Sequence, residues 1–222
     1  MQSNNQQKSA PEAKKRFFIN IGREFCSGGL SISEQLSKRF GIPYYDKELL
    51  MESSKASGVK PEVFEAADER TPSFFSNIWS FNLGFNTGSY LLGSSPISDE
   101  KIYAAQSNVM KTLAQNSSCL IVGRSADYVL RNHPGLISIF IHSSIEDRIL
   151  RIMNRRGINS AEKAREIAEK KDKLRASYYN FYTDKVWGDA AGYDLSIDSS
   201  KLPADAVADF IVSYVKARLA QM

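Results

Sequence analysis

Apolar and polar residues follow one another along the chain in blocks that predict strands separated by helices. Residues 16–22 and 136–143 are nearly continuous apolar runs, which is typical of strands buried on both faces of a parallel sheet. Residues 118–124 have the same character, and two shorter strands are predicted at 42–46 and 193–199. Because helical patterns separate these strands, the sequence predicts an α/β fold, a parallel sheet with helices on both faces.

The helical patterns differ in length and in the residues that begin them. Apolar residues at helical spacing predict helices at about 30–40, 98–116, 145–157 and 203–222, and a long helix that ends near 182. Ser143 followed by Glu146, and Asn159 followed by Glu162, have the spacing of a capping box. We therefore expect Ser143 and Asn159 to begin the helices that follow them.

Two segments depart from this alternation. Residues 1–15 are polar and lack an apolar run, which predicts a disordered tail rather than a signal peptide. Residues 71–97 are rich in aromatic residues, glycine, serine and asparagine, and nearly free of charge. A lid or a self-association surface would explain this composition, and so would a packed surface loop.

Composition narrows the class of protein. The 222 residues suffice for one domain over 16–222, and the net charge of +4 is too small and too scattered to indicate nucleic-acid binding. No run approaches the ~18 apolar residues of a membrane span, so no membrane association is expected. The two cysteines, Cys26 and Cys119, are predicted to be free thiols in a cytoplasmic protein. The two histidines lack metal-ligand partners at the usual spacings.

Candidate chemistry begins where the first strand runs into a glycine-bearing turn and then a helix. In the motif GxxxxGK[ST], backbone N–H groups surround phosphates, the lysine reaches the β- and γ-phosphates, and the hydroxyl holds Mg²⁺. Here Gly28 falls on the second glycine, Gly29 on the lysine, and Ser31 can offer the hydroxyl. We expect this turn to bind phosphate through Ser27, Gly28, Gly29, Leu30 and Ser31. A purely structural glycine turn is the alternative.

Residues that follow the other strands should reach the same crevice, because ligands of parallel sheets bind beyond the carboxyl ends of the strands. Arg124 follows a buried strand and is placed to bind an anionic group. Asp46 ends the second strand and is a candidate for holding a sugar or base, or for capping a turn. Asp127 either accepts a hydrogen bond from the substrate or caps the helix after Arg124.

Charged residues on two later helices complete the candidate site. Arg148 lies on the helix after the 136–143 strand, and Asp172 and Arg175 share one face of the long helix by their spacing. Guanidinium groups stabilise the charge on a phosphoryl group in transfer, so these three residues are the catalytic candidates. Surface ion pairs are the alternative interpretation.

Four stretches, taken together, resemble the cytidylate kinase-like family, relatives of bacterial cytidylate kinase. They read INIGREFCSGG, GIPYYDKELL, CLIVGRSADYVLR with IFIHSSIEDRILRI, and DKLRASYYNFYTDKVWGDAAGYDLSID. The resemblance covers nearly all of residues 17–220. It implies a P-loop kinase fold with a monophosphate-binding insertion at about 46–105 and a helical lid at about 150–185.

The resemblance also implies roles for single residues. Gly123 and Arg124 match the Gly-Arg pair that helps hold the monophosphate, and Asp172 and Arg175 match the end of the lid pattern RDxxDxxR. The chain departs from the family at the turn, where Leu30 stands in place of the arginine that members tend to carry after the glycines. The usual lysine is missing as well, and Gly29→Lys is expected to raise turnover.

The activity implied by the resemblance is transfer of the γ-phosphoryl group of ATP, with Mg²⁺, to a nucleoside monophosphate such as CMP or dCMP. The missing cation in the turn supports a second hypothesis, a non-catalytic nucleotide-binding sensor or partner-binding module. A third, an unrelated α/β protein with a structural turn, does not explain the four-part resemblance.

Overall fold

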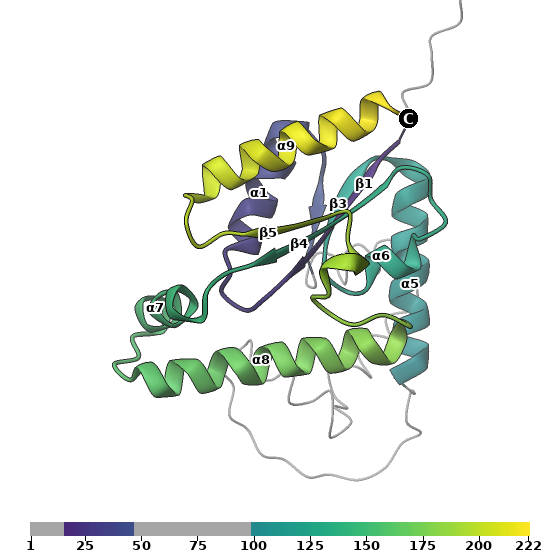
Figure 1. The fold of residues 1–222 in the computed structure, drawn as a ribbon. Coiled ribbons are helices and arrows are strands. Elements are labelled where there is room, and N and C mark those ends of the chain that lie inside the picture. Colours follow the sequence, from purple (N-terminus) through teal and green to yellow (C-terminus); the bar gives the residue numbers. More distant parts are fainter. Residues whose placement is uncertain (1–15, 47–98) are drawn as a thin grey trace, which may run out of the picture.

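A computed structural model describes residues 16–46 and 99–222 of the chain. The tail at 1–15, the segment at 71–97 and most of the expected insertion lie outside the described residues. Five strands form one parallel sheet in the order β2-β3-β1-β4-β5, which confirms the predicted α/β sheet (Figure 1). The strands are β1 (Phe18–Arg23), β2 (Tyr44–Tyr45), β3 (Cys119–Val122), β4 (Leu136–His142) and β5 (Leu195–Asp198).

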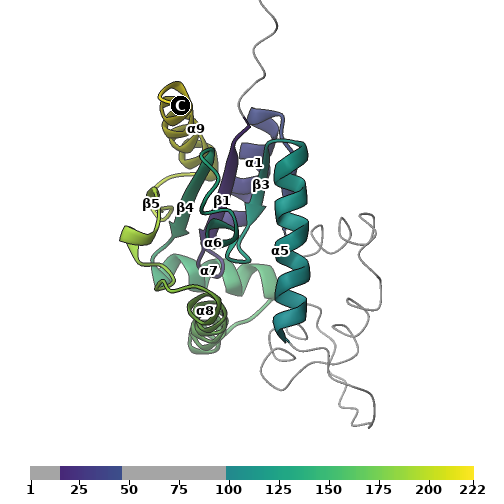
Figure 2. The same ribbon diagram turned by 90° about the vertical axis from the view of Figure 1, so that its right-hand side faces the viewer.

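Helices cover both faces of the sheet, and two more lie beyond the carboxyl ends of its strands (Figures 1 and 2). The helices are α1 (Gly29–Phe40), α5 (Asp99–Asn116), α6 (Ala126–Val129), α7 (Ile145–Arg156), α8 (Ala161–Tyr182) and α9 (Ala204–Ala220). Helices α1 and α9 pack on one face, α5 and α6 on the other, and α7 packs against α8. A short 3-10 turn, η1 (Ala190–Gly192), precedes β5.

The central strands are buried because each of their faces meets a different helix layer. Ile19 and Ile21 of β1 face α1 and α9, whereas Phe18 faces α5 and α6. Alternate residues of a strand point to opposite faces, so Asn20 also points to the α5 and α6 side. Asn20 is thus a buried polar residue of the central strand, 3% exposed, and its amide donates to the Ser138 hydroxyl at 3.5 Å.

Two predicted helix starts are displaced by one residue. Helix α7 is capped by Ser144, whose hydroxyl accepts from the Asp147 N–H, and α8 by Ser160, whose hydroxyl accepts from the Lys163 N–H. The expectations for Ser143 and Asn159 are therefore wrong. A serine follows each expected cap, and the Ser143 hydroxyl lies 3.2 Å from the Ser200 hydroxyl instead.

Two simpler expectations can be compared with the described residues. Cys26 and Cys119 are both free thiols, as predicted. No helix in the described part of the chain combines the length and the hydrophobicity that a membrane span requires.

Candidate functional site

The turn between β1 and α1 is held rigidly by groups from four other elements. The Glu24 N–H donates to the Ile141 carbonyl of β4 at 3.1 Å. On the α7 and α8 side, the Phe25 N–H donates to Asp172 Oδ1 at 2.7 Å, and Arg151 donates to the Cys26 carbonyl at 3.2 Å. Ser199, after β5, donates to the Ser27 carbonyl at 2.6 Å. The shape of the turn is therefore set before any ligand binds.

The end of the turn leaves backbone donors open. Gly28 precedes α1 with a left-handed φ of 84°, a conformation that glycine adopts without strain. Its carbonyl accepts the first helical hydrogen bond, from Ile32. Among the described residues, the N–H groups of 28–31 have no acceptor, as expected for the first turn of a helix. Open amides at a helix N-terminus attract anions, and phosphate in particular.

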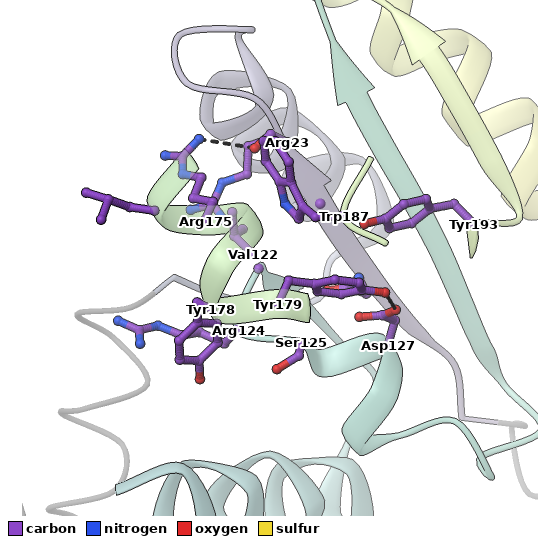
Figure 3. Close-up of a pocket in the computed structure, with 14 residues that line it drawn as sticks. Arg23, Val122, Arg124, Ser125, Asp127, Arg175, Tyr178, Tyr179, Trp187 and Tyr193 are labelled. Atoms are coloured by element: carbon purple, nitrogen blue, oxygen red, sulfur yellow. Dashed lines mark hydrogen bonds between the residues drawn. The ribbon is translucent and has the colours of Figure 1, made fainter. Parts of the chain in front are cut away.

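Next to this turn, a pocket lies at the carboxyl ends of β1 and β3 (Figure 3). The arginines that line it are Arg23, Arg124 and Arg175. Its other lining residues are Asn20, Gly22, Val122, Gly123, Ser125, Asp127, Leu174, Tyr178, Tyr179, Trp187 and Tyr193. The sequence-predicted Arg124, Asp127 and Arg175 thus meet in one cavity.

The pocket also holds buried hydrogen-bond acceptors. Asp127 is 1% exposed, and its Oδ2 accepts from the Tyr179 hydroxyl at 2.6 Å (Figure 3). Lys185 lies 3.5 Å from the same oxygen. Asp127 Oδ1 and Asn20 Oδ1 are buried without a hydrogen-bond partner among the described residues. Because buried acceptors are normally satisfied, these two oxygens are open to donors from a ligand or from water.

Arg23 was not predicted as a site residue, yet it joins the turn to the pocket. Its carbonyl accepts from Arg175 Nη1 at 3.1 Å (Figure 3). Its side chain runs past Gly29 towards Gly123. Arg23 ends a buried strand, as Arg124 nearly does. The rule that ligands bind beyond the ends of parallel strands therefore applies to Arg23 as it does to Arg124.

The three catalytic candidates separate into two groups. Arg148 is 5% exposed, and its guanidinium contacts the Phe25 carbonyl, Glu24 and Asp172. Asp172 in turn accepts from the Phe25 N–H. Arg148 and Asp172 thus form bonds that hold the turn in place. Arg175 lies 4.0 Å from Asp172 and also lines the pocket.

The remaining candidates lie at the borders of the site. Asp46 follows β2 and does not line the pocket, but its charge acts on Arg23. Ser31 is partly exposed in the first turn of α1. In the described part of the chain, no group of three or more histidine, cysteine or carboxylate residues could hold a metal ion. Mg²⁺ in phosphoryl-transfer sites needs only one or two protein ligands besides the phosphates, so a lone hydroxyl at Ser31 fits it.

Comparison with known proteins agrees with this geometry. Residues 18–201 match the sequence profile of the cytidylate kinase-like family. The chain belongs to the cytidylate kinase-like family. None of the curated proteins compared with the chain is similar to it in sequence.

Solved structures extend the comparison for this cytidylate kinase-like protein. An uncharacterized protein from Eubacterium ventriosum ATCC 27560 is 30% identical, covers 90% of this chain and 99% of its own, and has a TM-score of 0.67. A gluconokinase from Sinorhizobium meliloti 1021 is 17% identical over 94% of both chains, with a TM-score of 0.50. A shikimate kinase from Acinetobacter baumannii, in complex with shikimate, is 11% identical over 92% of this chain and 95% of its own, also at 0.50. The last two show the P-loop kinase fold alone.

Arg148→Ala tests whether the buried ion network holds the turn. The substitution leaves two largely buried carboxylates without their cation, so we expect the free energy of unfolding to fall by about 3 kcal/mol. Arg165→Ala is the matched control, because Arg165 also contacts two carboxylates but is exposed, and its loss should cost under ~1 kcal/mol. Urea denaturation measures both, and equal losses would contradict the assignment.

Proposed function

We propose that this protein transfers the γ-phosphoryl group of ATP to a nucleoside monophosphate, of which CMP and dCMP are the leading candidates. One observation carries the proposal. A rigid turn with open backbone amides lies beside a pocket lined by three arginines, and Arg23 belongs to both. Membership of the cytidylate kinase-like family supports a nucleotide as substrate.

The donor would bind through the turn. The open N–H groups of residues 28–31 and the N-terminal dipole of α1 favour a phosphate chain. Ser31 would be the protein ligand of Mg²⁺, which neutralises charge on the donor phosphates when bound. Because Asp172 and Arg151 hold the turn in place, little reorganisation is needed on binding.

The acceptor would bind in the pocket. Arg124 and Arg175 offer guanidinium groups to its phosphate, and the buried oxygens of Asn20 and Asp127 can accept from amino or hydroxyl groups at its other end. Tyr179, Tyr193 and Trp187 provide aromatic walls of the same pocket. An anionic end and a donor-bearing ring are the two halves of a nucleoside monophosphate.

The reaction needs no covalent help from the protein. An acceptor phosphate oxygen forms a bond to the γ-phosphorus while the bond from that phosphorus to the β-γ bridging oxygen breaks, which yields ADP and a nucleoside diphosphate. The transferring group carries its charge on its equatorial oxygens, so catalysis consists of positioning and positive charge. Arg175 is the candidate for that charge on the α8 side, and Arg148 and Asp172 position the turn.

A non-catalytic nucleotide-binding module is the second candidate function. The observation that favours it is the lack of a lysine at Gly29. Such a module would use the same turn and pocket for binding, so binding alone does not separate the two functions, and turnover does.

A phosphotransfer screen tests the proposed function. Purified protein, ATP and Mg²⁺ are combined with each common nucleoside monophosphate, and formation of ADP and of the diphosphate is followed by chromatography. We expect diphosphate formation above background with CMP or dCMP. Nucleotide binding without turnover would favour the sensor, and neither binding nor turnover would overturn both.

Gly28→Val tests the turn as the ATP site. A β-branched residue cannot adopt the φ of 84° without strain, so we expect ATP affinity to fall at least about tenfold. Gly41→Val is the matched control, since Gly41 has a φ of 64° at the other end of α1 and open space around it. Calorimetry with ATP should show the loss in Gly28→Val alone. If both variants lose affinity equally, the effect belongs to the helix and not to the turn.

Arg124→Lys tests the acceptor side. Lysine keeps the charge but loses the bidentate fork, so we expect monophosphate affinity to fall about tenfold while ATP affinity stays unchanged. Arg131→Lys serves as control, because Arg131 is exposed and stacks on Tyr128, away from the pocket lining. An unchanged monophosphate affinity in Arg124→Lys would remove Arg124 from the acceptor site.

A further inference from the structure

The side chain of Arg23 occupies the space that a side chain at position 29 would need. A Cβ atom built on Gly29 would lie 2.7 Å from Arg23 Cβ and 2.9 Å from Arg23 Cγ. Real Cβ atoms essentially never make non-bonded contacts this short, so a side chain at 29 would force the backbone or the side chain at 23 to shift. A lysine at 29 therefore does not fit beside the side chain at position 23, which in this protein is an arginine.

The far end of the same side chain reaches the pocket. A Cβ atom built on Gly123 would lie 2.1 Å from Arg23 Nη1, so Gly123, with a φ of 79°, leaves the guanidinium room. Arg23 thus extends from the first residue of α1 to the end of β3. Its side chain therefore lies between the turn and the pocket.

The charge of Arg23 is only partly compensated within the described residues, by the carboxylate of Asp46. No described carboxylate lies within ion-pair distance of its guanidinium, whereas Glu24, the next residue, is paired with Arg148. Loss of solvent lowers the pKa of Arg23 well below its ordinary value, Arg175 and Arg124 lower it further, and Asp46 raises it. Arginine remains protonated in proteins, so Arg23 cannot avoid the cost of burying its charge by losing a proton. Binding of an anion offsets that cost instead.

We propose that Arg23 supplies, from the end of β1, the cation that Gly29 does not, and that it binds the phosphoryl group in transfer. This inference rests on the proposed phosphotransfer. The guanidinium holds the oxygens of the γ-phosphoryl group while its bond to the donor breaks and its bond to the acceptor phosphate oxygen forms. Arg23 itself gains and loses no proton in this step.

Activity measurements provide the first test. Arg23→Gln keeps the packing against Gly29 but removes the charge, so turnover should fall by about 10²–10³-fold, as for loss of one transition-state donor. Arg23→Lys should retain more turnover than Arg23→Gln. Arg131→Gln removes one charge outside the pocket and should change turnover little. Turnover of Arg23→Gln within about threefold of the parent would overturn the proposal.

Relocating the cation provides a sharper test. Gly29→Lys alone should not raise turnover, because its side chain meets Arg23, contrary to the expectation from sequence. Arg23→Gly removes the obstructing atoms, so the double variant Arg23→Gly/Gly29→Lys should recover at least about tenfold over Arg23→Gly. A gain from Gly29→Lys alone, equal to or above the double variant, would overturn the proposal.

A binding measurement keeps this test separate from the proposed function. Tripolyphosphate, the phosphate chain without a nucleoside, is titrated into the parent, Arg23→Gln and Arg131→Gln by calorimetry. We expect affinity to fall about tenfold or more in Arg23→Gln alone. If Arg23→Gln alone loses affinity for tripolyphosphate and the parent shows no turnover, the phosphotransfer proposal fails, whereas the role of Arg23 in binding anions stands.

Thermal unfolding tests whether the role of Arg23 is merely structural. A buried cation that is only partly compensated destabilises the free protein, so Arg23→Gln without anion should be as stable as the parent or more stable. Added tripolyphosphate should raise the melting temperature of the parent more than that of Arg23→Gln. The proposal would be overturned if the parent does not bind tripolyphosphate. It would also be overturned if the free energy of unfolding of Arg23→Gln falls by as much as its free energy of tripolyphosphate binding.

Discussion

The buried ion network around Arg148 is the constraint on which the site depends. Its guanidinium binds groups of two other elements at once, the Phe25 carbonyl and Glu24 in the turn and Asp172 on α8. Because Arg148 itself belongs to α7, the network joins three elements. A charge removed from water is costly unless it is paired and hydrogen-bonded. All of these groups are satisfied together only when α7 and α8 lie against the turn. The network therefore sets the position of everything that α8 brings to the pocket.

The consequence is a division of charge across the turn. Glu24 and Asp172 are used on the side that faces α7, where Arg148 neutralises them. On the side that faces the pocket, three guanidinium groups converge, and the buried Asp127 carboxylate is engaged by Tyr179. The acidic residues thus stabilise the fold, and the excess positive charge is left at the place where the strands end. That distribution suits an anionic ligand better than the modest net charge of +4 would indicate.

The sequence predicts the sheet well because its signal is local and repeated: long apolar runs mark β1, β3 and β4, and the ends of parallel strands have to meet. The same reasoning brings Arg124 and Asp127 to one pocket. It fails where the answer depends on packing across the chain. Spacing on α8 indicates that Asp172 and Arg175 share a face, but not that one of them is bonded to the Phe25 amide. It also cannot show that Arg23 lies against Gly29, because the five-residue turn between them has to be built first.

The close approach of Arg23 to Gly29 changes what the absent lysine means. A motif places its cation at the start of the helix, but phosphoryl transfer requires only that positive charge be held near the moving oxygens. A guanidinium from the end of a buried strand meets this requirement, and the strand ladder and the bond from Arg175 to the Arg23 carbonyl hold its backbone. Glycine at 29 is then a condition for placing that guanidinium. Loss of the motif lysine therefore does not, by physical reasoning, imply loss of the chemistry.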